Sequence, residues 1–346
     1  EGRIDSQLPI RVNVADIADS AVNYIPEMQD SNDGLALLED EQDLLMRRLI
    51  VKFANDYFED DFYCYALPGG VSKQNLRAYQ REGEDCFSAR FLNPRGNFFL
   101  TTRTAGWCII MKETEISPLY FICGTPSDLS VRTLTGNTTF DMENLLRGIY
   151  ALDLEELRKM FFEGYHILPG AFDIYRDGSF ACRIIFERTA PAKERYRIKF
   201  RNSLGVFDII EIIGHATVAP DEGDDESSTI NKYDMVTDGF TQHHERTEST
   251  TSITIDSTFS RPHEVALLRD MLKSDEVYLI DLPGSPMAVI PSVENMSCEL
   301  RMTSPVKFTL SLRAVDPDAF VSDDISDSSD HRRKRIFQKE FSKQFN

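Results

Sequence analysis

The sequence predicts a mainly β fold: two β-sandwich-like domains, the second with one packed helix, plus extended terminal arms. Residues 196–214 form an alternating run, a turn at Asn202–Gly205 and a β-branched run, the pattern of a β-hairpin. Residues 306–315 show the cleanest two-residue alternation, with Phe308 and Leu310 on the apolar face. Many other short strand-like runs are separated by turn residues, which is typical of sandwiches and barrels.

Four regions are expected along the 346 residues. They are an N-terminal arm at 1–44, a β-sandwich domain at 45–190, a second β-sandwich domain at 191–319 with a helix at 262–273, and a C-terminal arm at 320–346. A chain of this length is long enough for two or three domains that each bury a core. Pro191 opens a new stretch of sequence, which sets the boundary near residue 190.

The first domain is expected to be built from strands and one helix. The predicted strands lie at 49–53, 62–67, 98–102, 107–111, 119–122, 171–175 and 180–186. The helix is expected over 153–162, because Leu154, Leu157 and Phe161 share one face and Asp153 is placed to cap its start. A tight turn is expected at 176–178. One further extended segment, 8–14, falls in the N-terminal arm.

The second domain continues from the hairpin through an acidic loop at 220–229, which has no large apolar residue and is expected to be exposed. Strands follow at 252–259 and 277–280. The helix between them is expected to have Ser260 at its N-cap, with Pro262 and Glu264 in the first turn. Its apolar face contains Val265, Leu268, Met271 and Leu272.

The formal net charge of −19 opposes non-specific binding to DNA and to anionic lipid. Simple solubility is the plainest interpretation of this charge. No run of about 18 apolar residues occurs, so no membrane-spanning segment is predicted. We expect no nucleic-acid partner and no membrane partner.

Six cysteines are present, and none of them forms a C-x-x-C pair. They are Cys64, Cys86, Cys108, Cys123, Cys182 and Cys298. Most lie in apolar runs, so we expect buried free thiols in a chain assembled under reducing conditions. A disulfide framework is the less favoured alternative.

No set of residues predicts a catalytic, cofactor-binding or metal site. His243 and His244 are adjacent, so on a strand they point to opposite sides, unlike the i, i+4 pair of a helical zinc site. Residues 221–226 resemble a calcium loop only loosely. No G-x-S-x-G, P-loop or G-x-G-x-x-G motif occurs. An enzyme is not expected, although glycosidase carboxylates, which come from separate strands, leave little trace in a sequence.

The C-terminal arm changes character twice. Residues 323–330 are acidic and serine-rich, and residues 331–335 form a basic block. Phe337, Phe341 and Phe345 follow at near-helical spacing. This pattern suggests an amphipathic arm that docks on a neighbouring subunit, with a frayed, solvated terminus as the alternative. The basic block could also touch nucleic acid, but the overall charge favours subunit docking.

Two regions of the sequence contain short structural motifs. The first includes the glycine turn at 68–74, the strand at 99–103 and the strand at 116–122. The second is the hairpin sequence KFRNSLGVFD at 199–208. Both regions resemble tail-associated virion proteins of phages that infect Bacteroidetes. The resemblance is loose at Leu204 and Ile209. It covers structural motifs and carries no catalytic residues.

The resemblance implies a phage virion structural protein, a tail, baseplate or neck component that assembles as a ring. Its partners would be other virion proteins and copies of itself, and it would be made in the bacterial host cytoplasm. The alternative is a carbohydrate-binding β-sandwich module, in which aromatic side chains form a stacking platform. The candidates for that platform are Tyr63, Tyr65, Phe98 and Trp107.

Overall fold

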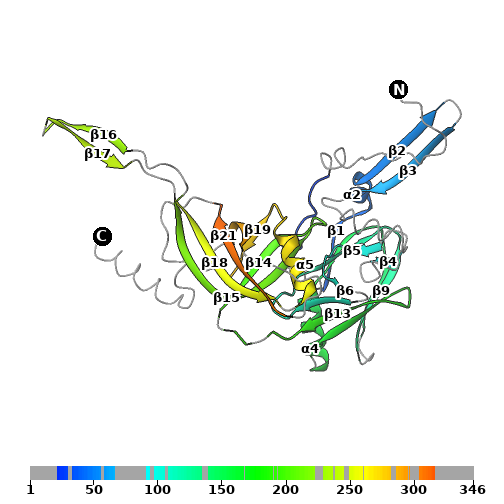
Figure 1. The fold of residues 1–346 in the computed structure, drawn as a ribbon. Helices are drawn as coiled ribbons and strands as arrows, with labels where there is room; N and C mark the ends of the chain where they lie inside the picture. The colour runs from blue at the N-terminus through cyan, green and yellow to red at the C-terminus, as the bar shows by residue number, and fades with distance from the viewer. Residues whose placement is uncertain are drawn as a thin grey trace, which may run out of the picture. The chain divides into compact units, whose positions relative to one another are not determined.

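The computed structural model divides the chain into two compact units (Figure 1). It describes residues 22–29, 33–55, 58–66, 91–93, 97–105, 108–134, 139–166, 168–189, 191–192, 194–222, 229–236, 238–244, 249–259, 261–281, 286–294, 296 and 304–315. The first unit contains residues 1–111, 116–187 and 202–207. The second contains residues 112–115, 188–201 and 208–346. The chain therefore passes between the units more than once.

The first unit contains two antiparallel sheets and a separate hairpin. The five-stranded sheet has the order β1-β11-β8-β5-β4, and the six-stranded sheet has the order β10-β9-β12-β13-β7-β6. The strands of the first sheet are β1 (Leu35–Glu39), β11 (Gly148–Leu152), β8 (Leu119–Cys123), β5 (Asn97–Phe99) and β4 (Phe91–Asn93). Those of the second are β10 (Thr139–Leu145), β9 (Ser127–Thr133), β12 (Ala171–Arg176), β13 (Ser179–Glu187), β7 (Cys108–Lys112) and β6 (Thr104–Ala105). The hairpin pairs β2 (Arg48–Asn55) with β3 (Phe58–Tyr65).

Two helices accompany these sheets, α2 (Glu41–Met46) and α4 (Leu154–Tyr165). The predicted helix and its cap are confirmed in α4, since the Asp153 carboxylate accepts the backbone N–H of Glu156 at 2.9 Å. Leu154, Leu157 and Phe161 are buried in the main core of the unit. The predicted turn at 176–178 is also present, because Asp177 and Gly178 both have positive φ and join β12 to β13.

The N-terminal region differs from the expected arm in one respect. Residues 35–39 form β1, which pairs antiparallel with β11. Gly148 in β11 permits this pairing, because a Cβ there would come within 2.5 Å of the Glu39 carbonyl oxygen. The predicted strand at 8–14 lies outside the described residues. The chain before residue 45 thus supplies an edge strand of the five-stranded sheet.

The turn between β14 (Arg195–Arg201) and β15 (Phe207–Glu222) belongs to the first unit. The Asn202 side chain holds it in shape: its Oδ1 accepts the N–H of Leu204 at 2.9 Å, and its Nδ2 donates to the Leu100 carbonyl at 3.1 Å. Gly205 has φ +85°, which favours glycine. Leu204 and Val206 are buried in a second core cluster of the first unit. The predicted hairpin is therefore confirmed, and its turn contributes to a core.

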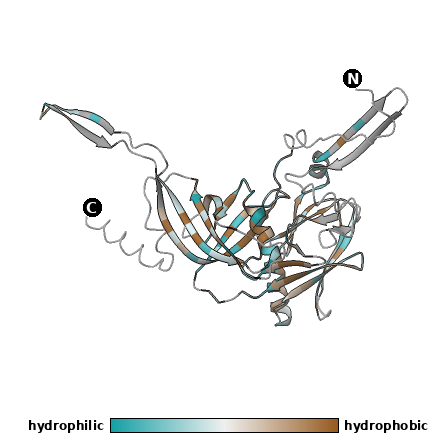
Figure 2. Cartoon of the chain, in the orientation of Figure 1, coloured by the Kyte–Doolittle hydropathy of each residue, from teal (hydrophilic) through white to brown (hydrophobic). Residues whose placement is uncertain are grey.

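The second unit is a closed barrel with the strand order β14-β15-β18-β21-β20-β19. Its other strands are β18 (Ser249–Phe259), β21 (Val306–Ala314), β20 (Met287–Glu294) and β19 (Val277–Leu279). Figure 2 shows apolar and polar residues alternating along these strands, and in β21 Phe308, Leu310 and Leu312 are buried. The mainly β prediction is confirmed, and in this unit the sandwich-like arrangement closes into a barrel.

Helix α5 (Pro262–Met271) packs Val265, Leu267, Leu268 and Met271 into the barrel core. The predicted N-cap, Ser260, is wrong: the cap is Arg261. The reason is the capping box, in which a glutamate three residues after the cap accepts the cap's backbone N–H. Glu264 does this for Arg261 at 3.1 Å, and that spacing fixes the start of the helix.

A two-stranded sheet of β16 (Thr229–Asp234) and β17 (Gly239–His244) lies between β15 and β18 in the sequence. Its six residue pairs run from Thr229↔His244 to Asp234↔Gly239. Asp238, with φ +47°, completes the turn. This hairpin is separate from the barrel in its hydrogen bonding.

Candidate assembly surfaces

The end of the β16–β17 hairpin is the most exposed apolar surface of the described residues. Met235 is 87% exposed, Val236 92% and Phe240 73%. Tyr233 lies opposite Phe240 in the register, and the centroids of their rings are 5.4 Å apart. We call these four residues the hairpin tip. A two-stranded ribbon is marginal by itself in water, so an uncovered tip of this kind is typical of a docking surface.

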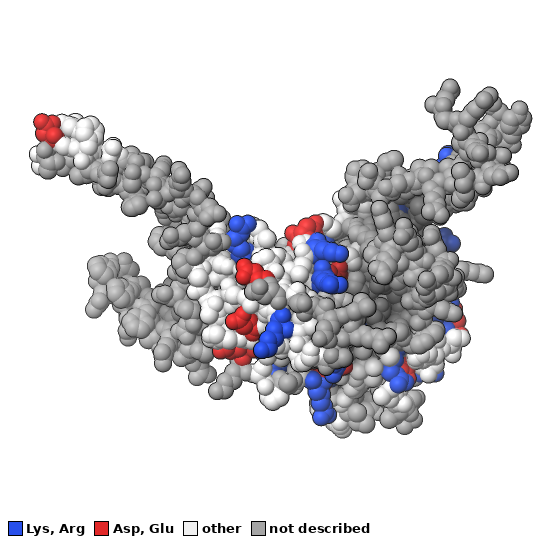
Figure 3. All heavy atoms as spheres, viewed as in Figure 1, with Lys and Arg blue, Asp and Glu red and all other residues white. Residues whose placement is uncertain are grey.

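One short polar interaction organises the hairpin tip. The Tyr233 hydroxyl donates to the Asp238 carboxylate, and this hydrogen bond raises the pKa of the Tyr233 phenol. In Figure 3 an acidic group stands at the end of the hairpin, and uncharged atoms lie beside it. Elsewhere on the face that Figure 3 draws, described acidic and basic side chains are interspersed. The hairpin tip thus combines a large apolar area with little charge.

Sheet edges are the other surfaces at which a β protein associates. The barrel has no open edge because its strands close. In the first unit β10 is an edge strand, with exposed Asp141 and Glu143 and a register shift between Met142 and Leu145. Asn144 there has φ +55°. Charges and irregular backbone oppose the addition of another strand, so β10 is a protected edge.

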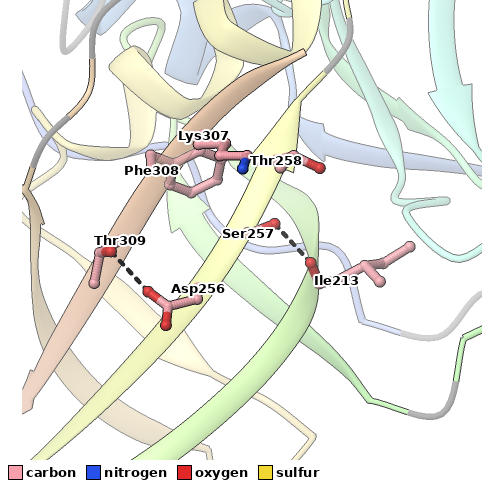
Figure 4. Close-up of a pocket in the computed structure, with 7 residues that line it drawn as sticks. All are labelled: Ile213, Asp256, Ser257, Thr258, Lys307, Phe308 and Thr309. Carbon is pink, nitrogen blue, oxygen red and sulfur yellow. Dashed lines mark hydrogen bonds between the residues drawn. The ribbon is translucent and has the colours of Figure 1, made fainter.

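A shallow groove of about 350 Å³ lies on the outside of the barrel (Figure 4). Seven residues of β15, β18 and β21 line it: Ile213, Asp256, Ser257, Thr258, Lys307, Phe308 and Thr309. Thr309 Oγ1 donates to Asp256 Oδ1 at 2.7 Å, and Ser257 Oγ donates to the Ile213 carbonyl at 2.6 Å. These hydrogen bonds join neighbouring strands, so they stabilise the sheet of the barrel.

A cavity of about 340 Å³ lies in the first unit beside the start of α2. A buried ion pair forms part of its wall: Arg47 Nε donates to Glu39 Oε2 at 2.5 Å, and a second bond joins Arg47 Nη2 to Glu39 Oε1. Arg47 Nη1 also donates to the Asn23 carbonyl at 2.6 Å. Leu38 packs against the same core as Ile25. These hydrogen bonds fix the position of the Arg47 side chain in the wall of the cavity.

The structure places only some of the residues considered from the sequence. Cys108, Cys123 and Cys182 are free thiols, as predicted, and Cys123 and Cys182 are buried. The side chains of Tyr63, Tyr65 and Phe98, and residue Trp107, lie outside the described residues, as do the His243 and His244 side chains. Among the described side chains, no group of three potential ligands is arranged to hold a metal ion. No helix in the described ranges is long and apolar enough to cross a bilayer.

The hairpin tip was not predicted from the sequence, although it contains the most exposed large apolar side chains of the described residues. No element was predicted for residues 230–240. The available signal was the pair Met235-Val236 between Asp234 and Asp238-Gly239. Apolar residues at a turn, where polar residues are usual, indicate a surface that meets something other than water.

Comparisons with known proteins include a partial structural likeness. No family model matches the chain. No curated protein matches it. Among solved structures, a chain from the tail of an empty GTA particle, a helical structure with C6 symmetry, is similar to 35% of this chain over 91% of its own length. The two share 9% sequence identity with a TM-score of 0.23, and we draw no functional conclusion from this likeness.

Proposed function

We propose that this chain is a structural component of a phage virion, and that it acts by assembly rather than by catalysis. It would occupy the tail, baseplate or neck, and copies of the chain would associate in a ring. Its partners would be other particle proteins and further copies of itself. The resemblance of residues 199–208 and of the first-domain strands to tail-associated proteins supports this proposal.

The observation that carries the proposal is the uncovered hairpin tip. Exposed Met235 and Val236 lie in the turn between β16 and β17, and exposed Phe240 lies at the start of β17. A contiguous exposed apolar patch of this kind usually marks a contact with another macromolecule. Burying it would be favourable at roughly 25 cal/mol for each Å².

The formal net charge of −19 favours a local apolar contact for association between copies. Like charges on two copies repel each other, and repulsion between exposed charges is screened beyond about 10 Å at ordinary ionic strength. Short-range burial of the hairpin tip then supplies attraction without requiring opposite charges. A membrane is a poorer partner for this tip because anionic lipid repels an acidic protein.

The test is incorporation into particles. The chain is expressed with its neighbouring genes, particles are purified by sedimentation, and the chain is quantified by mass spectrometry. We expect the parent chain to co-sediment with particles and M235S/V236S/F240S to remain in the soluble fraction. L134S, which changes an exposed leucine outside the hairpin, is the matched control and should be incorporated like the parent. Absence of the parent chain from purified particles would contradict the proposal.

A further inference from the structure

The cavity beside α2 has the features of a binding site for a basic peptide. Tyr24, Pro26 and Leu38 give it apolar walls, and Asp43 is an exposed acid in its lining. The Asp43 carboxylate has no side-chain partner among the described residues, whereas Glu39 is already paired with Arg47. An unpaired carboxylate beside an aromatic ring suits a Lys or Arg side chain.

The surroundings of the cavity strengthen this preference for positive charge. Residues 22–29 and 33–47 contain six acids and one base, namely Glu27, Asp33, Glu39, Asp40, Glu41 and Asp43 against Arg47. Glu41 has an exposed partner in Arg147 at 3.5 Å. Glu27, Asp40 and Asp43 are exposed. The local field around the cavity is therefore negative and attracts a cationic segment.

The chain itself contains a segment that matches this site. Residues 331–335, His-Arg-Arg-Lys-Arg, are the longest unbroken basic run in a sequence with 57 acidic and 38 basic residues. They lie outside the described residues, and Phe337 follows closely after them. A basic run next to an aromatic residue complements a cavity that combines carboxylates with apolar walls.

We propose that the cavity at Asp43 receives the basic segment 331–335 of a second copy of this chain. One Arg or Lys head group would pair with the Asp43 carboxylate, and its stem would lie against Tyr24 and Pro26. The buried Glu39–Arg47 pair would hold the wall in position. The assignment rests on the proposed function, because it supplies one of the contacts by which copies would associate.

The test uses the full chain in sedimentation velocity over a concentration series. The cavity variant is D43K, and the segment variant is R332Q/R333Q/K334Q/R335Q. Each variant alone is expected to self-associate about tenfold more weakly than the parent, the equivalent of about 1.4 kcal/mol. A mixture of the two is expected to recover association, because one partner retains the cavity and the other retains the segment.

Controls separate docking from folding and from net charge. E163K makes the same change of charge on the exposed face of α4 and should associate like the parent. D43N retains the shape of Asp43 and should show a smaller loss in the same direction, and circular dichroism verifies that each variant is folded. Parent-like association of D43K or D43N, or a mixture as weak as its components, would overturn the assignment.

The two proposals fail in different ways. If the parent chain is absent from purified particles, the proposed function fails whatever sedimentation shows. If the parent chain is incorporated while D43K associates like the parent, only the docking assignment fails.

Discussion

Arg195 donates a hydrogen bond from Nη1 to Oε2 of Glu211 at 3.3 Å, and the Glu211 carboxylate is completely buried. Its other oxygen, Oε1, has no hydrogen-bond partner. The backbone N–H of Glu211 donates to Glu115 Oε1 at 2.9 Å. Glu115 lies in the segment 112–115, which belongs to the second unit. The barrel therefore contains a buried carboxylate of which one oxygen is paired with Arg195 and the other lacks a hydrogen bond.

This pair predicts unequal effects of the two single substitutions. R195M leaves the Glu211 charge buried without its ion pair, and we expect the free energy of unfolding to fall by about 3 kcal/mol. E211Q removes the charge and should cost less. R195M/E211Q should then be more stable than R195M alone. The three variants and the parent form a double-mutant cycle, in which urea denaturation measures the free energy of unfolding of each protein. Equal losses of this free energy in the two single variants would contradict the prediction.

Alanine substitutions at two glycines, Gly214 and Gly164, are expected to have different effects on stability. A Cβ at this position would lie 2.0 Å from the Asp256 carbonyl oxygen on the paired strand β18, so G214A forces β15 and β18 apart. We expect G214A to lower the free energy of unfolding by at least about 2 kcal/mol. The matched control is G164A in α4, where a Cβ meets nothing within 4 Å. That variant should be neutral or up to about 1 kcal/mol more stable, and thermal unfolding compares the two.

Cys182 predicts a dependence of stability on pH. Burial raises the pKa of its thiol well above the usual range, so the thiol stays neutral in the folded state. In the unfolded state it ionises near pH 8.5. The contribution of this thiol to the free energy of unfolding is therefore complete below about pH 8.5. Above that pH the free energy of unfolding falls by at most about 1.4 kcal/mol for each pH unit, because the unfolded chain releases a proton that the folded chain keeps.

The variant that checks this sign is C182A. It should be less stable at neutral pH because of the cavity it leaves, but its stability should fall less steeply above pH 9. I184V removes volume from a buried neighbour on the same strand without removing a titratable group. It should retain the slope of the parent. Identical slopes for C182A and the parent in urea denaturation would show that Cys182 does not contribute.

Local sequence pattern predicted much of this fold because several strands have one buried face. In β21 the alternation of Phe308, Leu310 and Leu312 with polar residues matches the burial found. The hairpin turn at Asn202 was predictable because asparagine and glycine suit its backbone. The capping of α4 by Asp153 was predictable for the same local reason.

Other elements left no such pattern. All five residues of β11 are buried, so Gly148–Leu152 shows no alternation. The edge strand β10 carries Asp141 and Glu143 and looks like a loop in sequence. Closure of the barrel depends on long-range pairs such as Phe259↔Val306, which no local window contains. The hairpin tip was not predicted because its residues are exposed and belong to no buried face.

The accessibility of Met235 in particles is the most direct measurement of whether the hairpin tip takes part in assembly. In the free chain Met235 is 87% exposed and Met271 is fully buried, so peroxide should oxidise Met235 quickly and Met271 slowly. In purified particles, mass spectrometry should find Met235 protected almost as strongly as Met271, because the hairpin tip would lie in a contact. Oxidation of Met235 in particles at the free-chain rate would contradict a role for the hairpin tip in assembly.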